Sequence, residues 1–221
     1  MTDEVTAMGA PVTGASRIAM WSGPRTISTA LMRAWENRPD TVVVDEPLYG
    51  FYLARSGVPH PGREEIITSM PGDWPVVLDQ LAAAPLPDGK TVYYQKHMTH
   101  HLLPEVDRGA HPGVRGEQLE IFRLLGGPVV DAGDVLRRPR PMLEALCDAL
   151  GVRFDPAMLS WPAGPRPTDG VWARHWYDGV WRSTGFGPYR ESTAALPPAL
   201  EPLARECQRF YDEMYAHRIV A

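Results

Sequence analysis

Three short runs of apolar residues divide the first half of the chain, and each is predicted to form a strand. They cover residues 17–21, 41–45 and 91–95. The second run, TVVVD, is continuous and β-branched, as is typical of a strand buried on both faces of a parallel sheet. Elsewhere the apolar residues recur at helical spacing. The alternation of the two patterns predicts one α/β domain over residues 17–221.

Helices are predicted where the apolar spacing has a helical period. Residues 28–38 place Leu31, Met32 and Trp35 on one face, and Pro39 ends the helix. Shorter helices are predicted over residues 66–70, 74–84 and 139–150. A last amphipathic helix, near residues 199–217, is predicted to bury an apolar stripe made of Leu200, Leu203, Cys207, Phe210 and Met214.

Four segments carry other patterns. Residues 1–16 are rich in Thr, Gly and Ala and are predicted to be a mobile tail. Residues 54–64 contain two prolines and two glycines, which predicts a loop. Residues 128–131 predict a short strand. Residues 105–116, EVDRGAHPGVRG, are polar and glycine-rich and have no strand pattern.

The composition narrows the class of protein. The chain has 221 residues, of which 44% are hydrophobic and 22% charged, as in a globular domain. Its net charge of −5 gives no reason to expect a nucleic acid or a membrane as partner. Cys147 and Cys207 both lie in apolar helical patterns, so we expect two small core residues rather than a disulfide or zinc site. Without a signal-peptide pattern or an apolar run of membrane-spanning length, a soluble cytoplasmic protein is expected.

The junction after the first strand is predicted to bind an anion. The order is strand, the turn Ser22-Gly23-Pro24-Arg25-Thr26, then a helix from Ser28. Backbone N–H groups at a helix start lack partners within the helix and face such a turn, and Arg25 can clamp phosphate or sulfate oxygens. The turn lacks the second Gly and the Lys of an ATPase loop, which disfavours a nucleotide kinase. A plain turn with Ser28 as helix N-cap is the alternative.

Two separate segments resemble one family. SGPRTISTALMRAW resembles the 5′-phosphosulfate-binding loop of sulfotransferases that use 3′-phosphoadenosine 5′-phosphosulfate (PAPS). DAGDVLRRPRPMLEALCDALGVRFDPAML is similar to a later helical segment of the same family. The resemblance implies a P-loop-like, three-layer α/β/α fold with a mostly parallel sheet. It also implies a donor site made of Ser22, Gly23, Pro24, Arg25, Thr26, Ser28, Thr29, Trp181, Ser183, Thr184 and Gly185.

Sulfuryl transfer needs a cationic clamp, a base and an acceptor pocket, but no metal ion. Glu46 follows a buried strand, where desolvation raises the pKa of a carboxyl, and His97 follows the third strand. Family members use a base at one position or the other, and both remain candidates here. Lys96 either stabilises the bridging oxygen or is solvated. An acceptor pocket is predicted from Tyr49, His100, Trp172 and Trp176, although such aromatic residues are more often core.

One departure from the family matters. The family binds the 3′-phosphate with a strand ending in R-D-P-R or R-N-P-x and a helix that carries a Ser. That element is expected between Pro104 and Glu117, where the chain has only EVDRGAHPGVRG. One strand and its helix are therefore predicted to be missing, which leaves an apolar groove uncovered or makes neighbouring strands re-pair.

Two functions remain open from the sequence. The first is transfer of the sulfuryl group of PAPS to a small-molecule hydroxyl, in specialised metabolism. The second is a degenerate sulfotransferase-like subunit that serves as structural partner of a complete paralogue, because loss of the element would expose apolar surface. A homo-oligomer or a hetero-oligomer with a paralogue is compatible with both.

Overall fold

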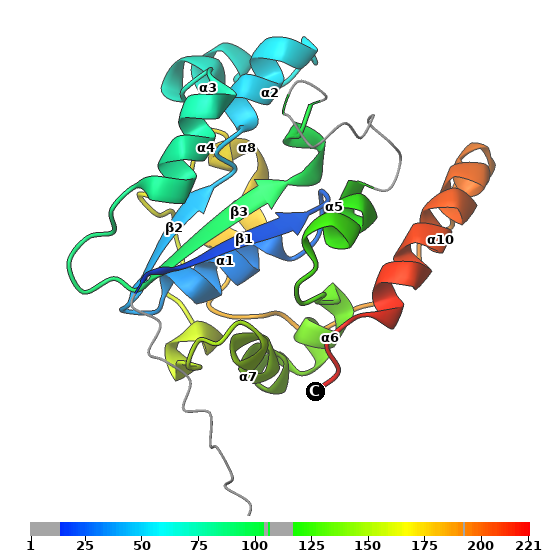
Figure 1. The fold of residues 1–221 in the computed structure, drawn as a ribbon. Coiled ribbons are helices and arrows are strands. Elements are labelled where there is room, and N and C mark those ends of the chain that lie inside the picture. The colour runs from blue at the N-terminus through cyan, green and yellow to red at the C-terminus, as the bar shows by residue number, and fades with distance from the viewer. Residues whose placement is uncertain (1–13, 104–105, 107–116, 192) are drawn as a thin grey trace, which may run out of the picture.

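The computed structural model describes residues 14–103, 106, 117–191 and 193–221. Its centre is a parallel sheet of β1 (Ser16–Ser22), β3 (Val92–Met98) and β2 (Thr41–Asp45), in the spatial order β1-β3-β2 (Figure 1). All three strands were predicted, β2 with its observed bounds. The register places Lys96 of β3 beside both Met20 and Asp45. β1 forms one edge of this three-stranded sheet.

Helices cover one face of the sheet with the largest apolar cluster. α1 (Ser28–Glu36) and α7 (Pro139–Ala149) pack there. Trp35 of α1 is fully buried and stacks on Tyr94 of β3 with ring centroids 5.3 Å apart. Leu143 of α7 is also fully buried. This face therefore supplies most of the hydrophobic stabilisation of the fold.

The opposite face is covered by α2 (Tyr49–Ser56) and α4 (Trp74–Ala83), whose buried residues include Phe51 and Leu81. Tyr93, the neighbour of Tyr94 in β3, packs against this second cluster because successive strand residues point to opposite faces. α3 (Arg63–Ser69) packs on α2. The α/β/α layering implied by the resemblance is confirmed.

The second half of the chain adds short elements around this centre. They are η1 (Thr99–His101), α5 (Glu117–Leu125), α6 (Ala132–Arg137), η2 (Pro156–Leu159), α8 (Ala173–Trp176), α9 (Asp178–Trp181), η3 (Pro198–Leu200) and α10 (Glu201–Ala216). The buried guanidinium of Arg33 in α1 pairs with Glu36 at 2.9 Å and also with Asp169. That second pair fastens the loop before α8 to the central layer. None of the described helices combines the length and apolar character that crossing a membrane requires.

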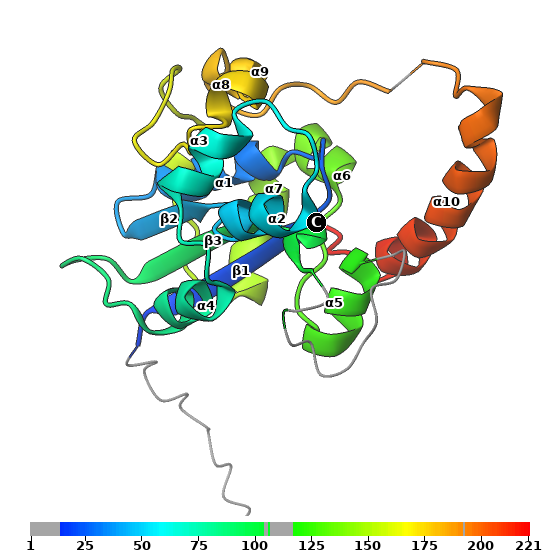
Figure 2. The same cartoon turned by 90° about the horizontal axis from the view of Figure 1, so that it is seen from above.

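The prediction for the last helix was wrong in one respect. α10 forms as expected, but none of its residues is buried, and it stands apart from the body in both views (Figures 1 and 2). Leu200 just before it and Leu203 within it are 46% and 49% exposed. Cys207 is exposed as well, while Cys147 is buried as predicted. Helical spacing identified the apolar stripe correctly, but spacing cannot show whether a surface exists to cover it.

Three smaller differences come from local context. The predicted loop at residues 54–64 is partly helical, since α2 continues to Ser56 and ends at Gly57 with φ 66°. The predicted strand at residues 128–131 is only an isolated bridge between Val129 and Arg218. The predicted tail lies outside the described residues as far as residue 13. The prediction that residues 105–116 lack a strand also concerns residues outside the described ones, apart from Val106.

Candidate functional site

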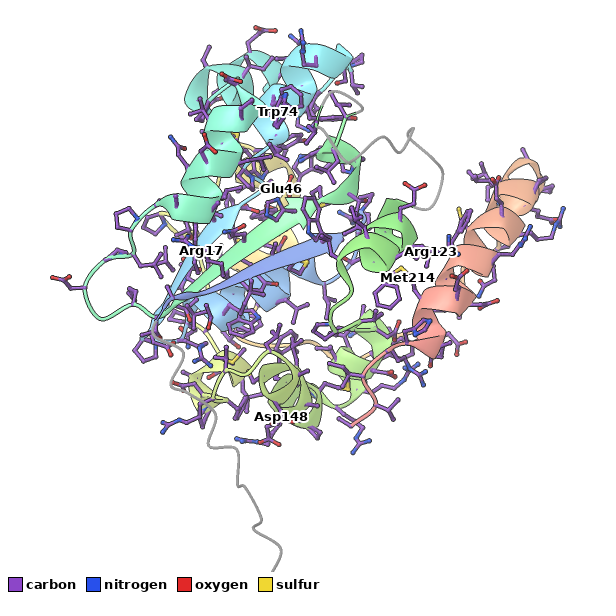
Figure 3. The ribbon with its side chains drawn as sticks, in the orientation of Figure 1. Arg17, Glu46, Trp74, Arg123, Asp148 and Met214 are labelled. Atoms are coloured by element: carbon purple, nitrogen blue, oxygen red, sulfur yellow. The ribbon has the colours of Figure 1, made fainter. Side chains whose placement is uncertain are left out.

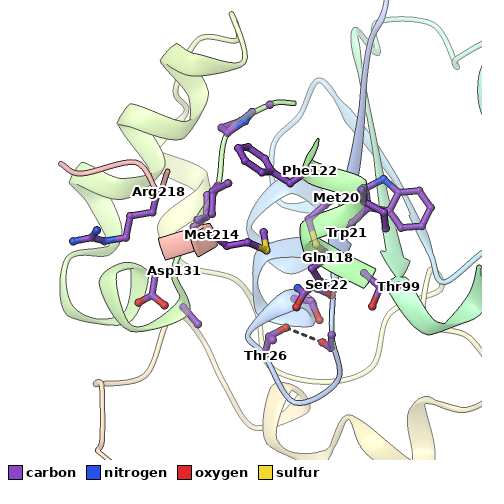
Figure 4. Close-up of a pocket in the computed structure, with 18 of the residues that line it drawn as sticks. Met20, Trp21, Ser22, Thr26, Thr99, Gln118, Phe122, Asp131, Met214 and Arg218 are labelled. Carbon is purple, nitrogen blue, oxygen red and sulfur yellow. Dashed lines mark hydrogen bonds between the residues drawn. The ribbon is translucent and has the colours of Figure 1, made fainter. Parts of the chain in front are cut away.

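The turn between β1 and α1 has the geometry of an anion site. Arg25 adopts φ 63°, a left-handed conformation that costs energy for a residue with a Cβ atom. Its side chain is exposed and has no hydrogen bond or ion pair with any described residue. Thr26 Oγ1 donates to Gly23 O at 3.3 Å, which closes the turn (Figure 4). The turn is thus fixed while its guanidinium stays available.

The start of α1 leaves its amides open toward this turn. Ile27 occupies the N-cap position, and no side chain caps the helix. Leu31 N donates to Ile27 O at 2.9 Å. The structure therefore does not support the alternative in which Ser28 is merely the N-cap. An uncapped helix start with its positive dipole end favours an anion.

A cavity of about 1020 Å³ adjoins the turn. It lies between the edge strand β1 and the helices α5, α6 and α10, and α10 contributes Leu203, Phe210 and Met214 to its wall. Figure 4 shows Ser22 and Thr26 on one side of it and Met214 on another. Of the predicted donor-binding residues, the cavity wall includes Ser22, Gly23, Pro24, Thr26 and Ser28. Arg25 and Thr29 lie outside the wall but within the same turn and helix start.

A second group of polar residues is buried where β2 ends. Lys96 Nζ donates three hydrogen bonds, to Asp45 Oδ1 at 2.8 Å, Glu46 Oε1 at 2.6 Å and Tyr177 OH at 2.8 Å. Tyr177 OH in turn donates to Asp45 Oδ2 at 2.6 Å. All four residues are buried. Lys96 is thus neither solvated nor free to reach a ligand, because its three N–H groups already have acceptors.

The cluster contains two carboxyl groups, those of Asp45 and Glu46, but a single ammonium group, that of Lys96. This excess of acidic groups affects the pKa values within it. Burial raises the pKa of Glu46 above its ordinary value of 4.5, and the Lys96 ammonium offsets only part of that effect. Burial alone lowers the pKa of Lys96, but Asp45 and Glu46 outweigh it and hold that pKa well above 10.5. Two carboxyl groups thus share one cation. The Glu46 carboxyl therefore binds a proton more readily than an exposed glutamate does.

The backbone at Glu46 is strained. Its φ is 45°, and Arg25 and Glu46 are the two non-glycine residues with positive φ in the described part of the chain. Glu46 N donates to Lys96 O at 2.8 Å, and Tyr49 N donates to Glu46 O at 2.9 Å, which hold this conformation. Strain of this kind is concentrated at functional sites. Both residues had been singled out from the sequence for chemistry. Figure 3 shows Glu46 at the end of the sheet away from Arg17.

The histidines near this cluster are buried and neutral. His97 lies within β3 rather than after it, and it stacks on Trp21 with ring centroids 4.2 Å apart. Burial lowers the pKa of His97 to about 4 and that of His101 well below 6.5. His101 Nε2 is 3.9 Å from Glu46 Oε2. A histidine with a pKa of about 4 is a weak base at neutral pH, so Glu46 suits the role better.

The predicted acceptor residues gather in a cluster of aromatic rings beside Glu46. Tyr49 stacks on His101 at 4.5 Å and meets the edge of Trp172 at 5.2 Å, and His100 also contacts His101. Trp172 is buried in the core, whereas Trp176 is 47% exposed. Tyr49 and Trp172 are therefore core residues as well as neighbours of the site. Their part in acceptor binding stays a prediction.

The remaining residues predicted to bind the donor lie beside α9 and outside the cavity wall. Trp181 Nε1 donates to Asp169 Oδ2 at 2.9 Å, and Ser183 Oγ accepts from Trp161 Nε1 at 3.1 Å. The backbone N–H of Trp161 also donates to Thr184 O. These groups already form hydrogen bonds with other residues of the chain. Their role in donor binding is still a prediction.

Sequence reasoning missed Asp45 and Tyr177. Asp45 was visible as a second carboxylate beside Glu46 at the end of a predicted strand. Tyr177 had no such signal, because it comes from a tract 132 residues further along the chain than Asp45. Within the described residues, no group of three or more His, Cys, Asp and Glu side chains could hold a metal ion.

The fold is that of a P-loop-like, three-layer α/β domain. The chain belongs to the sulfotransferase domain family, which it matches over residues 16–119 and 114–218. It is also similar to branched-chain-amino-acid aminotransferase-like proteins 2 and 1 of Arabidopsis thaliana, with 31% identity over 235 and 233 residues. These alignments cover 90% of this chain and 41% and 42% of the relatives, so the chain spans about two fifths of their length. No solved structure matches.

Proposed function

We propose that the protein transfers the sulfuryl group of PAPS to a hydroxyl of a small molecule. The observation that carries this proposal is the uncapped start of α1 beside an open cavity, with the unpaired guanidinium of Arg25 in the same turn. The amides of the turn and Arg25 bind the 5′-phosphosulfate, and Thr26, Ser28 and Thr29 offer hydroxyls to its oxygens. The nucleoside occupies the cavity.

In the reaction, the acceptor oxygen attacks the sulfur of the donor, and a new S–O bond forms. The bond from sulfur to the bridging phosphate oxygen breaks, and its electron pair stays on the nucleotide. Glu46 takes the acceptor proton, for which its raised pKa is suited. Arg25 and the helix start neutralise charge on the sulfuryl oxygens in the transition state.

Lys96 acts as a positioning residue in this scheme. Its ammonium holds Glu46 Oε1 at 2.6 Å and is itself fixed by Asp45 and Tyr177. Glu46 Oε2 stays outside this bond and faces His101 at 3.9 Å. The carboxylate is thus held by one oxygen, and the other is left for the acceptor proton.

Calorimetry with adenosine 3′,5′-bisphosphate, the nucleotide product of PAPS, tests the donor site. We expect binding by the native protein and none by Arg25→Ala, since Arg25 is the cation that clamps the 5′ group. Arg140→Ala is the matched control, because Arg140 is exposed on α7, where it pairs with Glu144 and lies over the Phe154 ring. No heat with the native protein at millimolar nucleotide would contradict the proposal.

A second function is favoured by one observation. Exposed large apolar side chains concentrate around α5 and α10: Leu124, Leu125, Leu196, Leu200, Leu203, Tyr211 and Val220. Such a surface suits a subunit that packs against a complete paralogue. Light scattering after size-exclusion chromatography separates the two functions. A well-behaved monomer that binds the nucleotide supports the enzyme, and a protein that aggregates unless the paralogue is present supports the structural partner.

A further inference from the structure

We infer that the donor site does not read a 3′-phosphate, so that adenosine 5′-phosphosulfate serves as donor at least as well as PAPS. This inference rests on the proposed function, because it concerns the same turn and cavity. The two donors share the 5′-phosphosulfate and differ only in the 3′-phosphate. The question is therefore whether the cavity holds a cation for a second anionic group.

The described cavity wall has two basic residues, and the first is engaged elsewhere. Arg17 lies near the start of β1, away from the turn at its end. Its guanidinium donates to the backbone oxygens of Leu81 at 2.9 Å and Ala84 at 2.6 Å, and it lies over the ring of Tyr93. These contacts fasten β1 to α4 on the opposite face of the sheet.

The second basic residue is also neutralised. Arg218 Nε donates to Asp134 Oδ2 at 2.9 Å, and Nη1 donates to Tyr215 O at 2.9 Å. The guanidinium also stacks on the Tyr215 ring, 3.6 Å from its centroid. Figure 4 shows it extending away from Ser22 and Thr26. The Asp134 carboxylate therefore already offsets the positive charge that Arg218 would present to a second phosphate.

The rest of the wall opposes a second phosphate. Asp131 and Glu206 both line the cavity, so the described wall contains two carboxylates as well as its two arginines. Asp131 is fixed there, since its Oδ1 accepts from Asp134 N and its Oδ2 from Tyr211 OH. Much of the remaining wall is apolar, including Phe122 and Phe210. Without a positively charged partner, a doubly charged phosphate has a higher free energy against this wall than in water.

The charged groups of the turn and the cavity thus match a donor with one anionic group, the 5′-phosphosulfate. Arg25 and the open amides of α1 can hold a 5′-phosphosulfate, and the cavity suits an uncharged nucleoside. A donor without the 3′-phosphate meets every one of these conditions. A donor with it gains no contact in the described residues and adds repulsion from Asp131.

Calorimetry with two simple probes tests this inference. Adenosine 5′-monophosphate is the product of the donor without a 3′-phosphate, and adenosine 3′,5′-bisphosphate is the product of PAPS. We expect the monophosphate to bind within about threefold of the bisphosphate or more tightly, and Arg25→Ala to abolish both. A bisphosphate that binds tenfold or more tightly overturns the inference and leaves the proposed function standing. Absence of binding by both nucleotides overturns the two together.

One further variant tests whether a cation outside the described residues binds the 3′-phosphate. Arg108 and Arg115 are the two arginines of the segment 107–116. In the double variant Arg108→Ala/Arg115→Ala, we expect the ratio of the two dissociation constants to stay unchanged. A selective loss of bisphosphate affinity would show that one of these arginines binds the 3′-phosphate, and the inference would be wrong.

Discussion

Lys96 Nζ in β3 lies 2.6 Å from Glu46 Oε1, and Glu46 directly follows the neighbouring parallel strand β2, 50 residues earlier in the chain. The same ammonium lies 2.8 Å from Asp45 Oδ1, its partner in the strand register. A single cation thus keeps two buried carboxyl groups in place. The stability of this end of the sheet depends on that cation, and so does the protonation state of Glu46, the proposed base.

Replacing Lys96 by Met should therefore destabilise the fold strongly. The substitution keeps much of the side-chain volume but leaves Asp45 and Glu46 buried without a cation, a loss that typically costs about 3–5 kcal/mol. Urea denaturation measures the free energy of unfolding. Lys90→Met is the matched control, because Lys90 bonds only to Pro39 O in an exposed setting, and it should cost less than about 1 kcal/mol. Equal effects of the two substitutions would contradict the structural role of Lys96.

Glu46→Gln should reduce turnover far more than donor affinity. The amide keeps the shape of the carboxylate but cannot take the acceptor proton, so we expect kcat to fall about 10²–10⁴-fold. In the native enzyme, turnover should fall as the pH drops through the pKa of Glu46, which lies above 4.5. The measurement is a pH–rate profile together with nucleotide titration. A parallel loss of binding and turnover would instead indicate a structural role.

The sequence was sufficient for the layers of the fold, because strands and helices leave periodic patterns. The runs that became β1, β2 and β3 and the apolar face of α1 were all visible. It also singled out Arg25 and Glu46, because each follows a strand of a parallel sheet, where ligands collect. These are the two strained positions in the described residues.

Other features depend on contacts that no local pattern contains. Tyr177 reaches the cluster from a distant tract, and Lys96 was placed after its strand because a charge inside a buried strand is unusual. The uncovered face of α10 is a further example. Its apolar stripe has the spacing of a core-facing helix, and only the arrangement of the described elements shows that none of its residues is buried.

The buried His97 should make the protein sensitive to acid. Its pKa is about 4 in the folded state, against 6.5 ordinarily, so below pH 6.5 the unfolded chain binds a proton that the folded chain does not. Stability is therefore complete above pH 6.5 and declines as the pH falls toward 4, by about 3 kcal/mol from this residue. In His97→Gln the decline should be shallower by that amount. His217→Gln, at an exposed position, is the control for the loss of a histidine side chain.

Because the apolar face of α10 is exposed, a substitution on that face should change the free energy of unfolding only slightly. Leu203 is 49% exposed on the cavity side of α10, whereas Leu143 of α7 is fully buried in the main core. Replacing a buried leucine by Ala removes packing and leaves a cavity, so Leu143→Ala should cost about 2–5 kcal/mol. Leu203→Ala should cost less than about 1 kcal/mol, since little of its surface is withdrawn from water. Thermal or urea unfolding of the two variants at low protein concentration measures the difference. A large loss at Leu203 in a monomeric sample would mean that α10 packs onto the edge of β1 in solution and that the cavity beside the turn is closed.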